Sequence, residues 1–471
     1  MLLIYTILYF VSVIFYYLQH RIIASVIMIS LAIFLYGLDV ANNKRIVTAR
    51  GLFVLGFIGG FGLSLLKLSK LSQDYNILTF IAVFISYFAL YFGTFLSDKK
   101  MDKNDNDAYR YKIEKIEATF LPQEILLIVL FIITCSSFIA EVVILKFIPI
   151  FTLATPHAYS TFHVFMLHYI TSFHSFIPCF AICNYFIEPT RKKSKVFLIL
   201  SFIYVIIMSL LMVSRSQLTL CIVLSLFIVL MYRLTLLKKI LSNKRNIIIL
   251  FFAGLFILAL YLIITINRSH SVEYLKGIFE MKNENIPIFI TQPYMYITHN
   301  FENLNYMIEN IFRFTFGRRV LYPFFTLTLV KKFFPIVTDA PYYIIKEELS
   351  TVTLIYDSYY DFGLVGVAVF CFIIGYVGKK LENQAYSIIK ADEPYKNNYI
   401  IILYSLYCYF MIFSFFQTYF SLTDTWVYII ILLIIVILFD MKKETKKKPL
   451  QKNDNQILNV ESSGGNYEKN D

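Results

Sequence analysis

The sequence predicts an all-α polytopic membrane protein with about twelve transmembrane helices and one long extracytoplasmic loop that contains short amphipathic helices. Three observations lead to this prediction. Of the 471 residues, 58% are hydrophobic and only 16% are charged, whereas soluble domains have about 25% charged residues. Apolar runs of about 20 residues, the length that crosses a bilayer, follow one another along the chain. One polar stretch of roughly 95 residues, from Asn267 to Asp361, interrupts them.

The apolar runs predict the membrane helices in chain order. The first run has no basic region before it and no small-residue cleavage site, so we expect it to be a retained helix and not a signal peptide. Gly363, Gly366, Gly375 and Gly378 give the tenth span a face of small residues suited to close helix contact. Glu141 is the main ionisable group expected inside a span. The predicted spans are 2–18, 22–38, 51–66, 76–96, 124–147, 162–187, 196–213, 217–232, 247–266, 362–378, 398–416 and 425–440.

The distribution of basic residues predicts the orientation of these helices. With both termini in the cytoplasm, 29 of the 43 Lys and Arg residues fall in cytoplasmic segments, as the positive-inside rule requires. The long polar stretch then lies outside. We therefore predict four regions: a nine-span bundle (1–266), an extracytoplasmic loop (267–361), three C-terminal membrane helices (362–440) and a disordered basic cytoplasmic tail (441–471).

Composition also excludes several classes of function. The net charge of +12 follows from the basic inner loops, and no nucleic-acid-binding motif accompanies it. All six cysteines fall in apolar runs, where a disulfide framework or a reactive thiol is not expected. His163, His168 and His174 do not share a helix face closely enough for a zinc site, and we predict neither a metal nor a cofactor.

Arginines gather at the predicted outer boundary of the membrane. Arg215 lies in a polar break between two spans, and Arg268 directly follows the ninth span. Arg313, Arg318 and Arg319 follow or end a predicted amphipathic helix at 300–314, which lies on the membrane or on the bundle and stops at Gly317. Taken singly, each position suits an ordinary arginine whose side chain extends to the membrane–water interface. Together they predict an anion site, because guanidinium binds two phosphate oxygens at once and stays charged.

The polar residues of the outer loop include candidates for a general base. His299 is the histidine we favour, because an outward imidazole accepts a proton near neutral pH. Asp361 is the carboxylate alternative, although spacing alone does not select it from the others in the loop. Tyr360 and its neighbours suit a membrane interface or a surface on which sugars stack.

The order of these features resembles the oligosaccharide repeat-unit polymerases, the Wzy group. The resemblance rests on the many spans, the Ser214-Arg215-Ser216 break, Arg268 after the next span, the long outer loop, and the ending Thr351-x-Thr353, Tyr360-Asp361-Phe362-Gly363-x-x-Gly366 and Ile374-Gly375-Tyr376. It implies a glycosyltransferase on the outer face of the bacterial inner membrane. Such an enzyme moves a growing chain from undecaprenyl diphosphate onto the next lipid-linked repeat unit, in the synthesis of O-antigen, capsule or another surface polysaccharide.

The resemblance also implies site residues and partners. Arg215 and Arg268 would hold the donor diphosphate, with Arg318 and Arg319 beside them, while His299 or Asp361 takes a proton from the acceptor hydroxyl. The bilayer, a chain-length regulator and a flippase would be partners. Three alternatives remain: an O-antigen ligase, a polysaccharide flippase or other transporter, and a non-enzymatic membrane scaffold.

Overall fold

The structure, a computed structural model, describes residues 1–101, 122–152, 158–187, 190–232, 272–333, 342–390 and 398–444. Within these ranges the chain forms helices and loops without a strand, and Ser69 and Met281 make an isolated β-bridge. The prediction of an all-α protein is therefore confirmed for the described part. The predicted ninth span, Arg268 and most of the C-terminal tail lie outside it.

Seven helical stretches among the described residues are long and apolar enough to cross a membrane. They are α2 (Arg21–Asn43), α5 (Ile77–Met101), α6 (Pro122–Leu145), the run of α8 (Leu167–Ser172), η3 (Phe173–Phe176) and α9 (Ile177–Ile187), α10 (Lys192–Leu211), α11 (Arg215–Tyr232) and α18 (Tyr356–Lys390). Four apolar stretches are shorter: α1 (Leu2–Tyr17), the run of α3 (Ala49–Phe53), η1 (Val54–Ile58) and α4 (Gly59–Ser64), α19 (Tyr399–Ile412) and α20 (Thr423–Glu444). Each stretch overlaps a predicted span, and together they define a multi-pass membrane protein.

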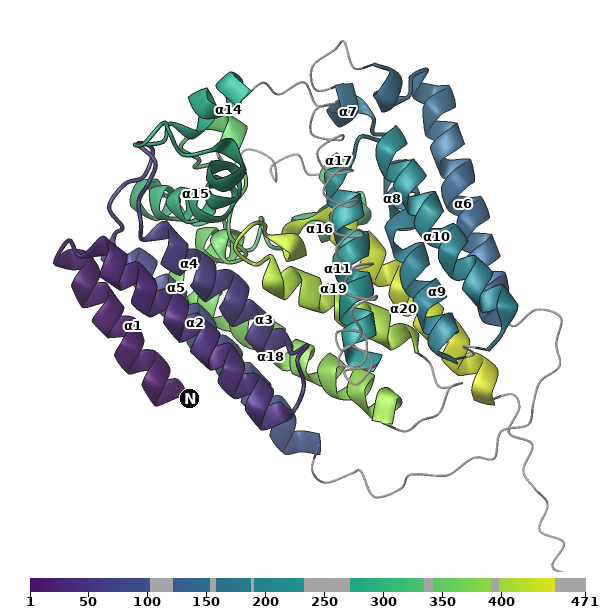
Figure 1. Cartoon of the computed structure of the whole chain (residues 1–471), viewed down its shortest axis with the longest axis horizontal. Coiled ribbons are helices and arrows are strands. Elements are labelled where there is room, and N and C mark those ends of the chain that lie inside the picture. Colours follow the sequence, from purple (N-terminus) through teal and green to yellow (C-terminus); the bar gives the residue numbers. More distant parts are fainter. Residues whose placement is uncertain are drawn as a thin grey trace, which may run out of the picture.

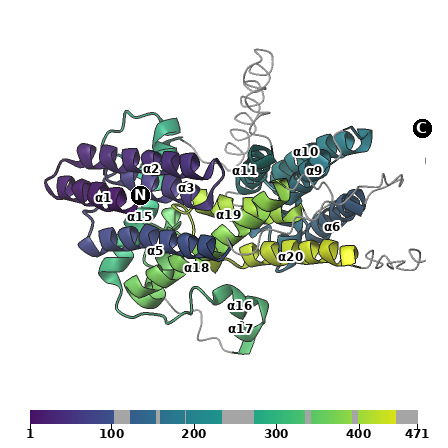
Figure 2. The same ribbon diagram turned by 90° about the horizontal axis from the view of Figure 1, so that it is seen from below.

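The helices form two groups joined by α19 (Figures 1 and 2). One group contains α1 to α5 with α18, and the other contains α6 to α11 with α20. Helix α19 packs against α3, η1 and α18 of the first group and against α9, α11 and α20 of the second. Its residues from Tyr399 to Met411 are buried on every side except at Ile400, as expected for an apolar helix in the centre of a bundle.

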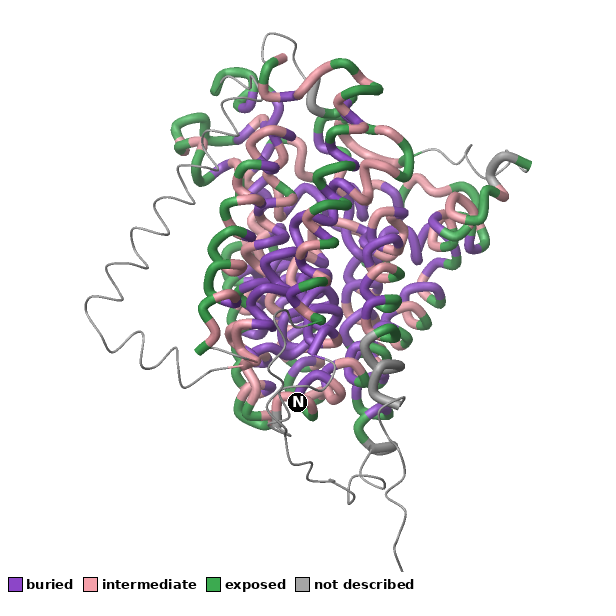
Figure 3. The backbone as a smooth tube through the Cα atoms, turned by 90° about the vertical axis from the view of Figure 1, so that its right-hand side faces the viewer, coloured by how far each residue is buried: buried purple, intermediate pink, exposed green. Residues whose placement is uncertain are grey.

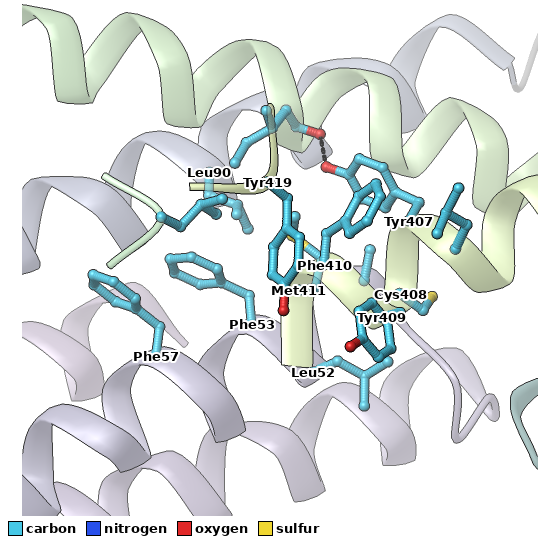
Figure 4. Close-up of a cluster of buried hydrophobic side chains, with 14 of the residues drawn as sticks. Leu52, Phe53, Phe57, Leu90, Tyr407, Cys408, Tyr409, Phe410, Met411 and Tyr419 are labelled. Carbon is cyan, nitrogen blue, oxygen red and sulfur yellow. Dashed lines mark hydrogen bonds between the residues drawn. The ribbon is translucent and has the colours of Figure 1, made fainter. Parts of the chain in front are cut away.

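Buried residues run through the middle of the bundle (Figure 3), and aromatic side chains fill the core around α19 (Figure 4). Phe53 and Phe57 stack with ring centroids 4.9 Å apart, and Phe410 stacks on Tyr419 at 4.9 Å. The hydroxyl of Tyr407 donates a hydrogen bond to the Ile374 carbonyl of α18. This bond satisfies a polar atom that has no access to water.

Glycines allow α5 and α18 to approach closely. A side chain at Gly93 would collide with the Phe372 carbonyl, and one at Gly375 would collide with the backbone of Leu90. Gly378 likewise leaves room for the Tyr407 ring of α19. The predicted small-residue contact face is thus confirmed for Gly375 and Gly378.

The other two glycines of the predicted face shape a bend in α18. The backbone leaves helical geometry at Phe362 (φ −142°, ψ 16°) and Gly363 (φ 62°, ψ −145°). Gly363 has a positive φ that other residues rarely adopt, and a side chain at Gly366 would collide with the Ser358 carbonyl. The bend lies where the sequence predicts that the chain re-enters the membrane.

Residues 272–333 and 342–355 form a cap over one end of the bundle, called here the cap end (Figure 1). The cap contains α14 (Val272–Phe279), α15 (Ile288–Asn310), α16 (Tyr322–Leu327), α17 (Val330–Phe333) and η5 (Glu347–Leu349). Its own small core includes Leu275, Phe279, Met295 and Leu349 and packs against Leu68 in the 65–71 loop.

Helix α15 differs from the predicted amphipathic helix at 300–314. It begins at Ile288, ends at Asn310, and packs on α4 and α14. Phe301 contacts the rings of Phe57 and Phe61, each at 5.4 Å, so the apolar face binds the bundle. The helix stops early because Ile311 is extended (φ −69°, ψ 120°), and Gly317 belongs to a later turn.

A buried ion pair fixes α15 to the bundle. Lys67 Nζ lies 2.7 Å from Glu302 Oε1, and both side chains are buried. The Tyr75 hydroxyl donates to the same carboxylate at 2.9 Å, and the Gln73 amide donates at 3.2 Å. Such a pair survives burial only when further hydrogen bonds satisfy its remaining atoms, and these two donors meet that condition.

That Glu141 is the main ionisable group inside a span stays a prediction, and other carboxylates lie within the long helices. Helices α2 and α18 extend past their predicted ends, and so place Asp39 and Glu382 inside helices. Both carboxylates are buried and paired, Asp39 with Arg50 and Glu382 with Arg45 at 3.0 Å. Pairing makes these charges tolerable away from water.

Replacing Gly375 with Ala should lower the free energy of unfolding by about 1–3 kcal/mol, because the added methyl group overpacks the contact with the Leu90 backbone. The matched control is Gly37→Ala, also in a membrane helix, where nothing lies within 4 Å of the added atom. That variant should be neutral or more stable by up to about 1 kcal/mol. Denaturant titration in detergent measures both. Equal effects of the two substitutions would contradict the close contact.

Candidate functional site

The structure brings together most of the predicted site residues of the outer loop. Arg313, Arg318 and Arg319 lie on the loop between α15 and α16 (residues 311–321), which we call the arginine loop. Tyr360 and Asp361 lie at the bend of α18 against this loop. Arg215 begins α11, elsewhere at the cap end, and has further interactions there. Whether these residues bind a phosphate stays a prediction.

Asp361 holds the loop in place. Its carboxylate accepts hydrogen bonds from the Thr315 hydroxyl, from the Arg319 amide at 3.2 Å and from the Val320 amide at 2.9 Å. The Phe316 amide donates to the Asp361 carbonyl at 3.2 Å. The side chain is fully buried, so this geometry assigns Asp361 to positioning the loop, and not to meeting a substrate hydroxyl.

Arg319 points inward, into a cage of aromatic rings. Its Nε donates to Asp357 Oδ1 at 2.7 Å, and its Cζ lies 4.3 Å from the centroid of Tyr342 and 4.5 Å from that of Tyr360. The side chain is 11% exposed. Burial alone would lower the pKa of Arg319, but the Asp357 carboxylate outweighs it and raises the pKa above its usual value. The guanidinium charge is therefore permanent and already neutralised.

Arg313 and Arg318 point outward from the same loop. Both are exposed, and neither guanidinium makes a hydrogen bond or ion pair with the described part of the chain. The adjacent residues Arg318 and Arg319 thus differ in their surroundings. Arg319 stabilises the loop, whereas Arg318, like Arg313, is available to an anion. The sequence did not distinguish them, because the turn that separates their directions depends on Asp361, far along the chain.

A second polar group at the cap end was not predicted as a site. We call Glu141, His163, His168, Tyr169 and Asp424 the histidine cluster. His168 Nδ1 lies 3.1 Å from Glu141 Oε1, and the His163 and His168 ring centroids are 5.1 Å apart. Asp424, at the start of α20, interacts electrostatically with both histidines.

His163 is the accessible base of the histidine cluster. It is exposed in the loop before α8. Partial burial and the neighbouring His168 lower the pKa of His163 below its ordinary value, so the imidazole is neutral near pH 7 and able to accept a proton. The signal in the sequence was the spacing of His163 and His168 at a helix start. Their carboxylate partners come from α6 and α20, so the sequence alone does not show the cluster.

Helix α16 connects the arginine loop with the histidine cluster. Tyr322, at the start of α16, lies near Tyr169. Phe324 packs on Trp426 of α20 with ring centroids 4.6 Å apart, close in sequence to Asp424. On the other side of α20, Tyr428 has Gln217 of α11 beside its hydroxyl. The cap end thus joins the helix of Arg215, the histidine cluster and the arginine loop.

His299, the histidine favoured from the sequence, lies inside the cap. Its ring is 2% exposed, and neither ring nitrogen has a hydrogen-bond partner. Burial, assisted by Lys346, lowers the pKa of His299 to about 4. The imidazole is neutral but not accessible, so the geometry favours His163 as a base.

No three His, Cys, Asp or Glu side chains converge as metal ligands within the described residues. Comparisons with protein-family models, with curated proteins and with solved structures find no match to this chain. The site is therefore interpreted from its own chemistry.

Arg319→Ala should lower the free energy of unfolding by about 3–5 kcal/mol, because it leaves Asp357 buried without its partner. Arg318→Ala is the matched control, at the next position and exposed, and should change stability by less than about 0.5 kcal/mol. Thermal unfolding of the purified proteins in detergent compares them. If Arg318→Ala were the more destabilising, the inward and outward directions of the two side chains would be wrong.

The buried His299 should make the protein sensitive to acid. Its folded-state pKa of about 4 lies below the unfolded value of about 6.5, so the unfolded chain binds a proton that the folded chain does not. The contribution of neutral His299 to the free energy of unfolding is fully present above pH 6.5. It falls by about 1.4 kcal/mol per pH unit as the pH drops toward 4.

The His299→Leu variant should lack this component of the acid sensitivity. Unfolding measured between pH 7 and pH 4 should show the stability of the variant rising relative to the unsubstituted protein as the pH falls. His20→Asn, at an exposed position, is the matched control for the loss of an imidazole that is not buried. A constant difference between His299→Leu and the unsubstituted protein at every pH would show that His299 does not titrate as proposed.

Proposed function

We propose that this protein is a membrane glycosyltransferase that polymerises undecaprenyl-diphosphate-linked oligosaccharide repeat units at the outer face of a bacterial cytoplasmic membrane. In this proposal about twelve helices cross the membrane, both termini are cytoplasmic, and the cap is extracytoplasmic. The distribution of Lys and Arg supports the orientation. The cap then stands on the side where lipid-linked sugars are joined.

The observation that carries the proposal is the pair of outward arginines on a rigid loop at the cap end. Arg313 and Arg318 are exposed, whereas Arg319 and Asp361 hold the loop that bears them. A diphosphate group needs guanidinium donors that are not already paired. A preorganised pair of them also stabilises the negative charge that builds on a diphosphate leaving group.

The reaction needs a base as well as a cation site. The acceptor hydroxyl oxygen attacks the anomeric carbon of the donor sugar, the bond from that carbon to the diphosphate oxygen breaks, and the electron pair leaves with undecaprenyl diphosphate. The hydroxyl proton goes to Nδ1 or Nε2 of His163, which Asp424 and Glu141 surround with negative charge. His163 replaces His299 and Asp361 in this role, because both of those side chains are buried.

Arg215 and Arg268 remain part of the proposal. Arg215 begins α11, and Gln217 in the first turn of that helix lies beside Tyr428, next to the histidine cluster. Arg268 lies outside the described residues, and its role rests on the resemblance alone. Both would extend the cationic surface from the arginine loop toward the reacting bond.

The test uses purified protein in liposomes with a lipid-diphosphate oligosaccharide that serves as donor and acceptor. The unsubstituted protein should produce a ladder of polymers and release undecaprenyl diphosphate. Arg313→Ala, Arg318→Ala and Arg215→Ala should each slow the reaction about 100-fold to 1,000-fold, as expected for the loss of one transition-state donor. His163→Asn should slow it about 100-fold to 10,000-fold. Electrophoresis of the labelled sugar measures all four.

Arg21→Ala is the matched control, because Arg21 also lies at the cap end but pairs with Asp74 at 2.8 Å. It should retain the full rate. A single transfer to an unrelated acceptor without a ladder would assign the protein to the ligases instead. Movement of the lipid between leaflets with no new glycosidic bond would assign it to the flippases. Full rates in all four variants would contradict the site.

A further inference from the structure

The cap carries an unusually apolar exposed segment directly after α15. Seven large hydrophobic side chains in residues 312–333 are exposed, and we call them the aromatic segment: Phe312, Phe314, Phe316, Leu321, Phe324, Leu329 and Phe333. Phe312 is 94% exposed and Phe316 is 69% exposed. A contiguous patch of this kind marks a surface that another apolar phase covers.

The aromatic segment continues the exposed apolar stripe of α18. That stripe consists of Phe362, Val365, Val369, Ile373 and Val377, which lie on one face at helical spacing and are all exposed. An exposed apolar face on a membrane helix contacts lipid chains. Phe316 packs edge-on against Phe362, with centroids 6.2 Å apart. The lipid-facing surface of α18 therefore runs without a break into the loop.

The far end of the aromatic segment is attached to a second membrane helix. Phe324 of α16 packs on Trp426 near the start of α20, and the indole Nε1 of Trp426 donates to the Phe420 carbonyl at 2.7 Å. Trp is typical of the boundary between lipid chains and headgroups. In Figure 2, α16 and α17 project from the side of the bundle next to α18 and α20.

Charge identifies what covers this surface. Arg313 lies between Phe312 and Phe314, Arg318 lies two residues after Phe316, and both arginines are exposed. Interfacial membrane segments combine aromatic side chains with basic residues in this way, because the rings enter the lipid while the cations meet headgroup phosphates. The interface with a second copy of the chain would bring these arginines together, which like-charge repulsion opposes.

We propose that residues 312–333 form an in-plane membrane anchor in the leaflet next to the cap. The aromatic side chains insert below the headgroups, and Arg313 and Arg318 contact the phosphates of anionic phospholipids at the surface when no substrate diphosphate occupies them. The anchor holds the arginine loop at the level of lipid phosphates. It does not depend on the reaction proposed above, and its failure would leave that reaction open.

Tryptophan fluorescence in lipid nanodiscs tests the anchor. The chain has a single Trp, so Trp426→Phe provides a background without Trp fluorescence. Phe312→Trp and Phe316→Trp are then made in the full-length protein, which is placed in nanodiscs of phosphatidylglycerol and phosphatidylcholine brominated high on the acyl chain. We expect bromine to quench the fluorescence of each variant by roughly half or more, as for an inserted interfacial side chain.

Phe289→Trp is the matched control. Phe289 is 72% exposed in the same cap, but it follows the exposed polar turn at 282–285 and should not be quenched. Equal and weak quenching at positions 289, 312 and 316 would overturn the anchor, whether the segment faces water or a second copy of the chain. Replacing Arg313 and Arg318 by Gln in the Phe312→Trp protein should reduce quenching in anionic discs and leave it unchanged in neutral discs. No change in either disc would overturn the headgroup contact.

Discussion

The buried carboxylate of Asp361 is the constraint on which the cap end depends. An ionised group without water is costly unless hydrogen bonds surround it, and the donors available to Asp361 are the hydroxyl of Thr315 and the amides of Arg319 and Val320. The loop must therefore close on the bend of α18. Once it has closed, consecutive residues of the turn point in opposite directions, so Arg319 enters the bundle and Arg318 faces outward. One acid thus decides which arginine is structural and which is accessible.

The same physical rule accounts for the other buried charges. Lys67 with Glu302 and Asp39 with Arg50 are pairs in which each ion meets an opposite charge. The first pair joins elements that are distant in sequence, and the second joins α2 to α3. Buried pairs of this kind specify which elements meet and add little net stability. Arg313 and Arg318 depart from this rule, because they are exposed cations that have no carboxylate partner among the residues that the structure describes. In the proposals above, a lipid or substrate phosphate is the anion that these arginines meet.

Local patterns in the sequence predicted the membrane helices, because the length and composition of an apolar run are determined by the bilayer and not by distant residues. Gly375 and Gly378 were predictable for the same reason, since small residues on one face indicate close packing. The burial of His299 was not predictable, because helical periodicity does not tell whether a face meets lipid, water or another helix. The histidine cluster was missed because Glu141, His168 and Asp424 meet only when α6, α8 and α20 assemble.

The anchor and the proposed chemistry place the same requirement on the arginine loop. A polyprenyl diphosphate keeps its tail in the bilayer, so its charged group moves only within the headgroup layer, and a site for it must open sideways as well as outward. Arg318 on a loop flanked by Phe316 satisfies both conditions, because the ring contacts the lipid-facing stripe of α18 while the guanidinium lies beside it. The reacting hydroxyl of the lipid-linked acceptor lies on a sugar, and His163 is correspondingly exposed. In the proposed reaction the arginine loop therefore meets the lipid-borne diphosphate of the donor, while exposed His163 is open to a sugar hydroxyl of the lipid-linked acceptor.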